Sequence, residues 1–179
     1  MFAKISKEQW LKDLEKYTFY NHEYDKNEEY LNESYDAIQI PDRGSLFSAG
    51  YDFYIPYNYS LSSSKRDIIL TGIRWDTTQK IEEKTFNDPL VLLLFARSSV
   101  AKECGFSLMN KVGVIDMDYC MADNEGHIMI LVDRKTAKTD YTFKTGDRIV
   151  QGVITSFHID ENDHVRNSKR TGGFGSTGK

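Results

Sequence analysis

The feature that most constrains the fold of this chain is a series of short β-type runs that begins at Ala37. The runs are AIQIP, YDFYIP, DIILTGI, LVLLLF, VGVID, HIMILV, YTFK and RIVQGVI, and turn residues separate them in PDRG, SSSK, NDP, DNEG and TGD. Strands this short and this frequent favour an all-β barrel or sandwich over a βαβ fold. A length of 179 residues predicts one domain with room for a short appendage.

Residues 1–35 differ from the rest, because they are rich in Glu, Lys, Tyr and Asn and contain no Gly or Pro. Ser6 followed by Gln9 is typical of a capping box. Apolar residues then recur at helical spacing: Trp10, Leu11, Leu14 and Tyr17. The pattern predicts a helix over 6–17, packed on the main domain or serving a separate function. We therefore expect an N-terminal helical extension (1–35), a β domain (36–165) and a flexible glycine-rich segment (166–179).

Charge and cysteine usage limit the partners. The formal net charge is -4, so a long nucleic acid is not an expected partner, although a small anionic ligand remains possible. Cys104 and Cys120 form no C-x-x-C pair, which fits a reducing, cytoplasmic setting. The start of the chain lacks a secretory signal, and the apolar run over 90–96 is too short to cross a bilayer, so no membrane association is expected.

The C-terminal stretch TGGFGSTG is suited to binding a phosphate. Its glycines leave backbone amides unobstructed, so that consecutive N–H groups can surround an anion. Ser176 and Thr177 add hydroxyl donors, and Lys169 and Arg170 add positive charge. Phe174, between glycines, has no core to join and is a candidate to stack on a base. A disordered linker has the same composition, and this alternative stays open.

Two internal stretches carry polar residues at the end of an apolar run. In ARSS, Arg97 offers a planar fork that suits a phosphate, and Ser98 and Ser99 can donate to its oxygens. In NKVGVIDMDY, Asp116 is placed to orient a water molecule, and Tyr119 to pack against a sugar. Each has a simpler interpretation, a polar turn for the first and a hairpin with solvated acids for the second.

Two further stretches combine glycine with an isolated polar residue. In SAGYDF, Gly50 before a strand predicts a bulge or a close backbone approach, and Asp52 suits a metal, an arginine or a turn. In GDRIVQ, Gln151 stands inside an apolar run and must find a partner, because an unpaired buried amide costs stability.

In this order, the stretches SAGYDF, ARSSVA, NKVGVIDMDY, GDRIVQ and GGFGSTG resemble the motifs of the trimeric dUTPase family, over residues 37–179. The resemblance implies a jelly-roll or distorted β-barrel that assembles as a homotrimer, with active sites shared between subunits and a C-terminal lid. It implies Mg²⁺-assisted hydrolysis of dUTP to dUMP and pyrophosphate, which limits uracil incorporation into DNA and supplies dUMP for dTTP synthesis.

The resemblance also implies a role for each matching residue. Asp52 would hold magnesium through water, and Asp116 would activate the attacking water. The phosphate-binding residues would be Arg97, Ser98, Ser99, Gln151, Arg170, Ser176 and Thr177. The nucleoside-binding residues would be Asn110, Gly113, Val114, Ile115, Tyr119, Phe174 and Gly175, with Tyr119 under the deoxyribose and Phe174 over the uracil.

Several positions depart from the family pattern. Ala96 replaces a usual Pro, Cys120 replaces a usual basic residue, and CMADNEG lengthens the turn after Tyr119. Lys169 and Arg170 compete for the contact with the γ-phosphate. The segment 74–90 is longer than in compact members, which together with the N-terminal extension predicts a phage-type enzyme acting in a host cytoplasm.

Two alternatives stay open at this point. A dCTP deaminase shares the fold but would lack the GGFGSTG tail and would need a deaminating Glu near the hairpin, where this chain has VIDMDY. A regulatory module that binds another protein would use the N-terminal extension and the 74–90 insert.

Overall fold

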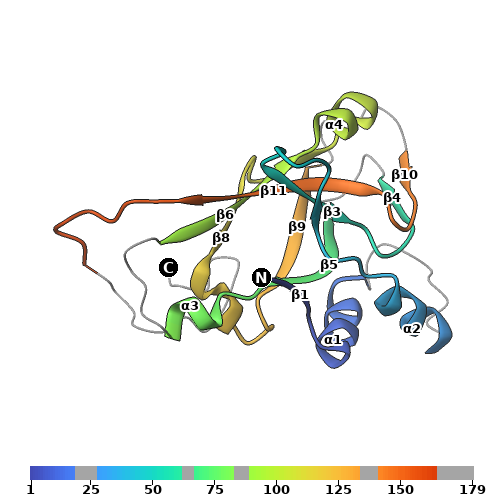
Figure 1. The fold of residues 1–179 in the computed structure, drawn as a ribbon. Coiled ribbons are helices and arrows are strands. Elements are labelled where there is room, and N and C mark those ends of the chain that lie inside the picture. Colours follow the sequence, from blue (N-terminus) through green and yellow to red (C-terminus); the bar gives the residue numbers. More distant parts are fainter. Residues whose placement is uncertain (19–27, 62–66, 83–88, 134–140, 165–179) are drawn as a thin grey trace.

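The computed structural model describes residues 1–18, 28–61, 67–82, 89–133 and 141–164. Two antiparallel sheets form the body of the chain (Figure 1). The first has the order β1 (Phe2–Lys4), β5 (Asp67–Trp75), β9 (His127–Asp133), β7 (Ser107–Leu108). The second has the order β2 (Asp42–Arg43), β3 (Gly50–Tyr54), β11 (Arg148–Ser156), β6 (Leu90–Ala96), β8 (Gly113–Asp116). A third pair joins β10 (Tyr141–Phe143) to β4 (Tyr59–Leu61). This arrangement confirms the predicted all-β fold of jelly-roll type.

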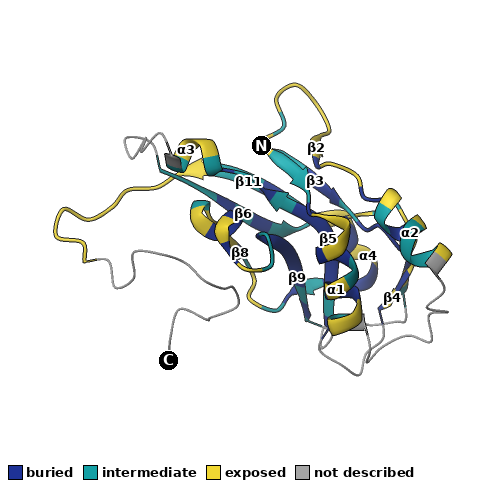
Figure 2. Ribbon diagram, turned by 90° about the horizontal axis from the view of Figure 1, so that it is seen from below, coloured by how far each residue is buried: buried dark blue, intermediate teal, exposed yellow. Residues whose placement is uncertain are grey.

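The two large sheets differ in how they are covered. Strands β5 and β9 are buried along almost their whole length, and helix α1 (Lys7–Thr18) packs against β5, with α2 (Glu28–Asp36) beside α1 (Figures 1 and 2). Strand β6 instead alternates, with Leu92 and Leu94 buried and their neighbours only half-buried. One face of the five-stranded sheet therefore meets the core, and the other remains partly open.

The N-terminal segment is integrated into the core. A helix is present where the sequence predicts one, and the side chain of Trp10 is fully buried. Half of the capping box forms, since the Gln9 N–H donates to Ser6 Oγ at 3.1 Å. Strand β1 pairs with β5, and the extension contains a second helix, α2, in addition to the helix predicted over 6–17. The boundaries expected at residues 35 and 165 stay predictions.

Some sequence-based expectations are wrong in detail. The run AIQIP forms no strand, because Ile38 packs its side chain over Gly72 of β5 instead of joining a sheet. The PDRG turn contains the edge strand β2, and the serines after Arg97 open helix α4 (Ser98–Cys104). The short elements β1, β4, β7, α3 (Thr78–Glu82) and the 3₁₀ helix η1 (Met117–Met121) were not predicted. The predicted turn at SSSK and most of NDP lie outside the described residues.

Candidate active site

A polar pocket lies where β3, β11 and the end of β6 meet; we call it the arginine pocket. Its lining residues are Gly44, Ser45, Ser48, Ala49, Gly50, Asp52, Arg97, Ser98, Ser99, Arg148, Gln151 and Val153. The register of the sheet brings them together, because Gln151 on β11 pairs with Asp52 on β3 and with Phe95 on β6. The three stretches SAGYDF, ARSS and GDRIVQ, far apart in sequence, therefore form one site.

One carboxylate organises the charges of the arginine pocket. Asp52 Oδ1 accepts from Arg97 Nε at 2.9 Å, and Asp52 Oδ2 accepts from Arg148 at 3.2 Å. The Asp52 side chain is only 12% exposed, so these contacts are shielded from water. The Arg97 side chain makes no further hydrogen bond within the described part of the chain, which leaves its terminal nitrogens for an anionic ligand. Two arginines against one aspartate give the pocket a net positive charge.

The loop that borders this pocket is ordered by its own hydrogen bonds. Arg43 donates to the carbonyl oxygens of Leu46 and Ser48, at 3.1 and 3.3 Å. Ser48 Oγ accepts from the Ser45 N–H at 3.0 Å. Nearby, Tyr54 donates to Asp42 at 2.6 Å, and this hydrogen bond raises the pKa of Tyr54 to about 12, so the phenol stays neutral.

Gly50 fulfils the predicted close approach. A Cβ atom at this position would lie 2.8 Å from Gln151 Oε1. The glycine therefore leaves the Gln151 amide room to lie along the pocket wall. This contact explains why a glycine is the first residue of β3, the strand that carries Asp52.

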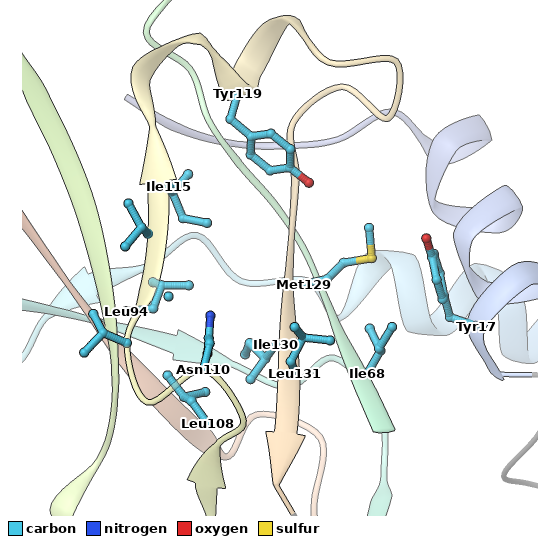
Figure 3. Close-up of a pocket in the computed structure, with 13 residues that line it drawn as sticks. Tyr17, Ile68, Leu94, Leu108, Asn110, Ile115, Tyr119, Met129, Ile130 and Leu131 are labelled. Carbon is cyan, nitrogen blue, oxygen red and sulfur yellow. The ribbon is translucent and has the colours of Figure 1, made fainter. Parts of the chain in front are cut away.

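A second, mainly apolar pocket lies beside the β7–β8 hairpin; we call it the hairpin pocket (Figure 3). It has a volume of about 610 Å³. Its lining residues are Tyr17, Ile68, Leu94, Leu108, Asn110, Val112, Gly113, Val114, Ile115, Tyr119, Met129, Ile130 and Leu131. The pocket exists because β7 pairs with β9 in one sheet, whereas β8 pairs with β6 in the other, so the hairpin bridges the two sheets.

The hairpin is shaped by two tight features. Lys111 has a φ of 63° and follows Asn110 at the tip, where the Lys111 N–H donates to the Leu108 carbonyl at 3.0 Å. Gly113 is buried, and a Cβ there would lie 3.1 Å from Leu94 Cβ. The absence of a side chain lets β8 pack directly against β6, with its backbone facing the pocket.

Tyr119 and Asp116 lie at the far end of the hairpin. The Tyr119 ring is buried and lines the pocket, and its hydroxyl donates to the His127 carbonyl at 2.9 Å. Asp116 ends β8 and is exposed, and its backbone has the extended conformation that precedes η1. Asp116 is not among the residues that line either pocket.

The predicted site residues thus fall into two groups in a single chain. Asp52, Arg97, Ser98, Ser99 and Gln151 line the arginine pocket, and Asn110, Gly113, Val114, Ile115 and Tyr119 line the hairpin pocket. Lys169, Arg170, Phe174, Gly175, Ser176 and Thr177 lie outside the described residues.

Sequence reasoning missed several lining residues. Arg148 stands in the motif GDRIVQ, where its charge before an apolar strand was a usable signal. Tyr17, Met129 and Leu131 carried none, since apolar residues on a helix or strand look like ordinary core.

The oxygen ligands that the arginine pocket offers suit a magnesium ion that keeps most of its water molecules. Within the described residues, no group of three or more His, Cys, Asp or Glu side chains is placed to hold a metal. The arginine pocket offers the single carboxylate of Asp52. Magnesium keeps several waters and commonly binds one or two carboxylates plus substrate phosphates, so this donor set suits it. In the described part of the chain, no helix has the length and apolar character needed to cross a membrane.

Comparisons with known proteins agree with one another. A family model described as dUTPase matches residues 36–178. The deoxyuridine 5'-triphosphate nucleotidohydrolase of Lactococcus lactis subsp. lactis is 37% identical over 144 residues, covering 79% of this chain and 89% of that protein. The dUTPase from Streptococcus mutans superposes with a TM-score of 0.59 at 30% identity, covering 71% of this chain and 91% of that one. The phage phi11 dUTPase of S. aureus, described with a structural Mg(II) ion, shares the fold at 18% identity (TM-score 0.55), covering 74% and 93%.

Proposed function

The chain belongs to the dUTPase family and is a dUTP diphosphatase, and from this premise we propose that its two pockets are complementary halves of an active site shared between copies of the chain. The hairpin pocket of one copy takes the deoxyuridine, and the arginine pocket of a neighbour takes the triphosphate. The observation that carries this proposal is that one chain holds both sets of site residues in two separate pockets.

The open face of the five-stranded sheet supports a homotrimer. Along one cross-strand row, Val153 on β11 pairs with Leu93 on β6, which pairs with Val114 on β8. Val114 is 57% exposed, and the other two are half-buried. A row of partly exposed apolar side chains that continues into the arginine pocket is typical of a surface covered by a partner.

The end of the described chain supports the same assembly. After β11, residues 157–164 run away from the body of their own chain (Figures 1 and 2). Phe157 and Ile159 are exposed there, at 42% and 50%. A segment that leaves its own domain in this way is suited to cross a neighbouring copy and deliver the C-terminal residues to that copy's site.

The hairpin pocket suits a deoxynucleoside. Asn110 and the backbone from Gly113 to Ile115 supply polar groups for the uracil edge in an otherwise apolar wall. The Tyr119 ring packs against the deoxyribose and leaves no space for a 2′-hydroxyl. The base is selected by hydrogen bonds, and the sugar by the volume available.

The arginine pocket suits the phosphate chain. Arg97, held by Asp52, presents its free edge to phosphate oxygens, and Ser98, Ser99 and Gln151 add neutral donors. Arg148 adds a second charge, which strengthens the attraction for a polyanion. Phosphoryl transfer needs positioning and charge neutralisation above all.

The reaction needs one base. Asp116 accepts a proton from a water molecule while the oxygen of that water attacks the α-phosphorus of dUTP. The bond to the β-phosphate breaks, and pyrophosphate leaves. Asp52 would hold a hydrated magnesium ion, and this ion would supply neutralisation of the charge on the phosphates. The C-terminal residues Phe174, Gly175, Ser176 and Thr177 close the site, and either Arg170 or Lys169 contacts the γ-phosphate. A variant ending at Thr171 should lose most turnover, and full activity of this variant would remove the lid from the mechanism.

Hydrolysis of a nucleotide panel tests the function. Pyrophosphate release should be fastest with dUTP, slow with UTP, dTTP and dCTP, and dependent on magnesium. Rapid deamination of dCTP would instead support the deaminase alternative. Light scattering of the active protein should give three copies; full activity as a monomer would refute the shared site.

We place the reaction in the cytoplasm, and a regulatory partner at residues 1–35 or 74–90 stays a prediction.

A further inference from the structure

The N-terminal helix α1 is fastened to the turn that follows Tyr119. Glu125 of this turn receives two hydrogen bonds from Ser6, at 2.8 Å from the main-chain N–H and 2.5 Å from Oγ. These bonds give partners to the N–H and the hydroxyl of Ser6, the residue that precedes α1, and they hold the turn against the start of the helix. The lengthened turn and the N-terminal extension, both departures from the family pattern, are therefore in direct contact.

A second, buried connection lies about two turns further along the helix, at Asp13. His127 is fully buried, and its Nε2 accepts from the Gly72 N–H at 2.9 Å. A backbone N–H can only donate, so the imidazole proton resides on Nδ1. His127 Nδ1 then donates to Asp13 Oδ2 at 2.7 Å, and the Asp13 side chain is only 5% exposed. Trp10 of the same helix packs on the imidazole, with ring centroids 6.0 Å apart.

The same histidine holds the tyrosine of the hairpin pocket. The Tyr119 hydroxyl donates to the His127 carbonyl oxygen at 2.9 Å and accepts from Asn124 Nδ2 at 2.9 Å. The His127 N–H donates to the Asn124 carbonyl at 3.1 Å, so both partners of the hydroxyl belong to one turn. A chain of short contacts thus runs from Asp13 through His127 to Tyr119.

From this chain of contacts we propose that Asp13 is a positioning residue that sets the selectivity of the enzyme for deoxyribose. The inference rests on the proposed role of Tyr119 under the sugar. The Tyr119 ring excludes the 2′-hydroxyl of a ribonucleotide only if the ring cannot move. A displacement of about 1 Å is enough to change turnover 100-fold in an active site that depends on exact positioning. Asp13 restrains His127 by a charge-assisted bond shielded from water, and His127 restrains the ring. Tyr17 of the same helix also lines the hairpin pocket, so α1 contributes to its wall.

The test compares kcat/KM for dUTP and UTP in the full-length enzyme. Asp13→Asn keeps the shape but removes the charge, and the preference for dUTP should fall about tenfold. The KM for dUTP should rise while its kcat changes little, because Asp116 is untouched. Leu14→Ala on the same helix is the matched control, since it removes a buried side chain and leaves both Asp13 and His127 unchanged. It should lower the melting temperature and leave the preference unchanged.

A double-mutant cycle tests whether Asp13 acts on selectivity through the Tyr119 hydroxyl. Tyr119→Phe keeps the ring and removes the hydroxyl, so it should also lower the preference, and adding Asp13→Asn should then change nothing further. An unchanged preference in folded Asp13→Asn, or an equal loss in Leu14→Ala, would overturn the proposal. If Asp13→Asn does not fold, Glu125→Gln carries the test, with an expected loss of about two- to threefold. A parent enzyme that hydrolyses UTP as well as dUTP would instead refute the role of Tyr119.

Discussion

The arginine pocket and the hairpin pocket differ in what their walls contain. The first gathers three charged side chains and four serines around the ends of strands, and Arg148 there is 48% exposed. The second is formed mainly by aliphatic and aromatic residues that also belong to the core, such as Leu94 and Ile130. In the proposed shared site, the phosphate half would depend on charge placed on a stable frame, whereas the nucleoside half would depend on the packing of the frame itself.

Because the two walls differ, we expect substitutions in the two pockets to have different effects on turnover and on the free energy of unfolding. A substitution in the arginine pocket should change turnover with little change in the free energy of unfolding, because its side chains are partly solvated. A substitution in the hairpin pocket should change both, since each lining side chain supports the core.

The largest effect is expected at Asp116, which belongs to neither pocket wall. Asp116→Asn should keep nucleotide binding and lose activity by about 10²–10⁴-fold, the usual contribution of a general base. Pyrophosphate release and equilibrium binding of a non-hydrolysable dUTP analogue measure the two properties. Asp118→Asn is the matched control, because this acid lies two residues later in the same exposed segment, and it should stay within a few-fold of the parent. Equal activity of parent and Asp116→Asn would exclude this base.

The next effect tests whether the geometry of the arginine pocket matters beyond its charge. Arg97→Lys keeps the positive charge but cannot contact Asp52 and a phosphate together, so kcat/KM should fall about 10- to 100-fold. The melting temperature should change little. Arg148→Lys should cost less, because Arg148 is more exposed than Arg97. Equal losses in the two variants would show that total charge, not the fork of Arg97, binds the substrate.

The same difference explains how much of the site was predictable. Asp52, Arg97 and Gln151 were predicted because a polar residue beside an apolar run is conspicuous in a sequence. Tyr17 and Met129 were not, because an apolar side chain in a pocket wall is indistinguishable from one in the core. The bond between Asp13 and His127 joins residues 114 positions apart, and no local pattern signals it.

The fold was predictable to a similar extent and for similar reasons. Strands β6, β9 and β11 were found because they are long and rich in β-branched or aliphatic residues. Strands of two or three residues, such as β7, were missed, because pairing with a partner strand determines them rather than their own composition. The composition around Ile38 predicts a strand, but Ile38 lies in an irregular segment because its side chain packs over Gly72.

A smaller effect is expected in the hairpin pocket at Gly113, where stability and binding should change together. Gly113→Ala adds a Cβ that would lie 3.1 Å from Leu94 Cβ, so β8 must move outward. Overpacking of this kind costs about 1–3 kcal/mol, and the KM for dUTP should rise because the hairpin backbone shifts. Denaturant unfolding and steady-state kinetics measure the two. Adding Leu94→Ala should relieve the crowding, so that the double variant is more stable than the sum of the two losses predicts. Strict additivity would show that the two residues do not interact.

The smallest effect is expected at Gly50, which tests whether the arginine pocket uses the Gln151 amide. Gly50→Ala places a Cβ 2.8 Å from Gln151 Oε1, and because that atom is the free end of a flexible side chain, the amide moves and the fold is little affected. We expect kcat/KM to fall about three- to tenfold, the effect of one misplaced hydrogen bond. Gly44→Ala is the control, since this glycine lines the same pocket and has no atom within 4 Å of an added Cβ. Its kinetics should match the parent. In a Gln151→Ala background, Gly50→Ala should have no further effect, because the displaced amide is already absent. A loss that persists there would mean that Gly50 acts through the backbone of β3 and not through Gln151.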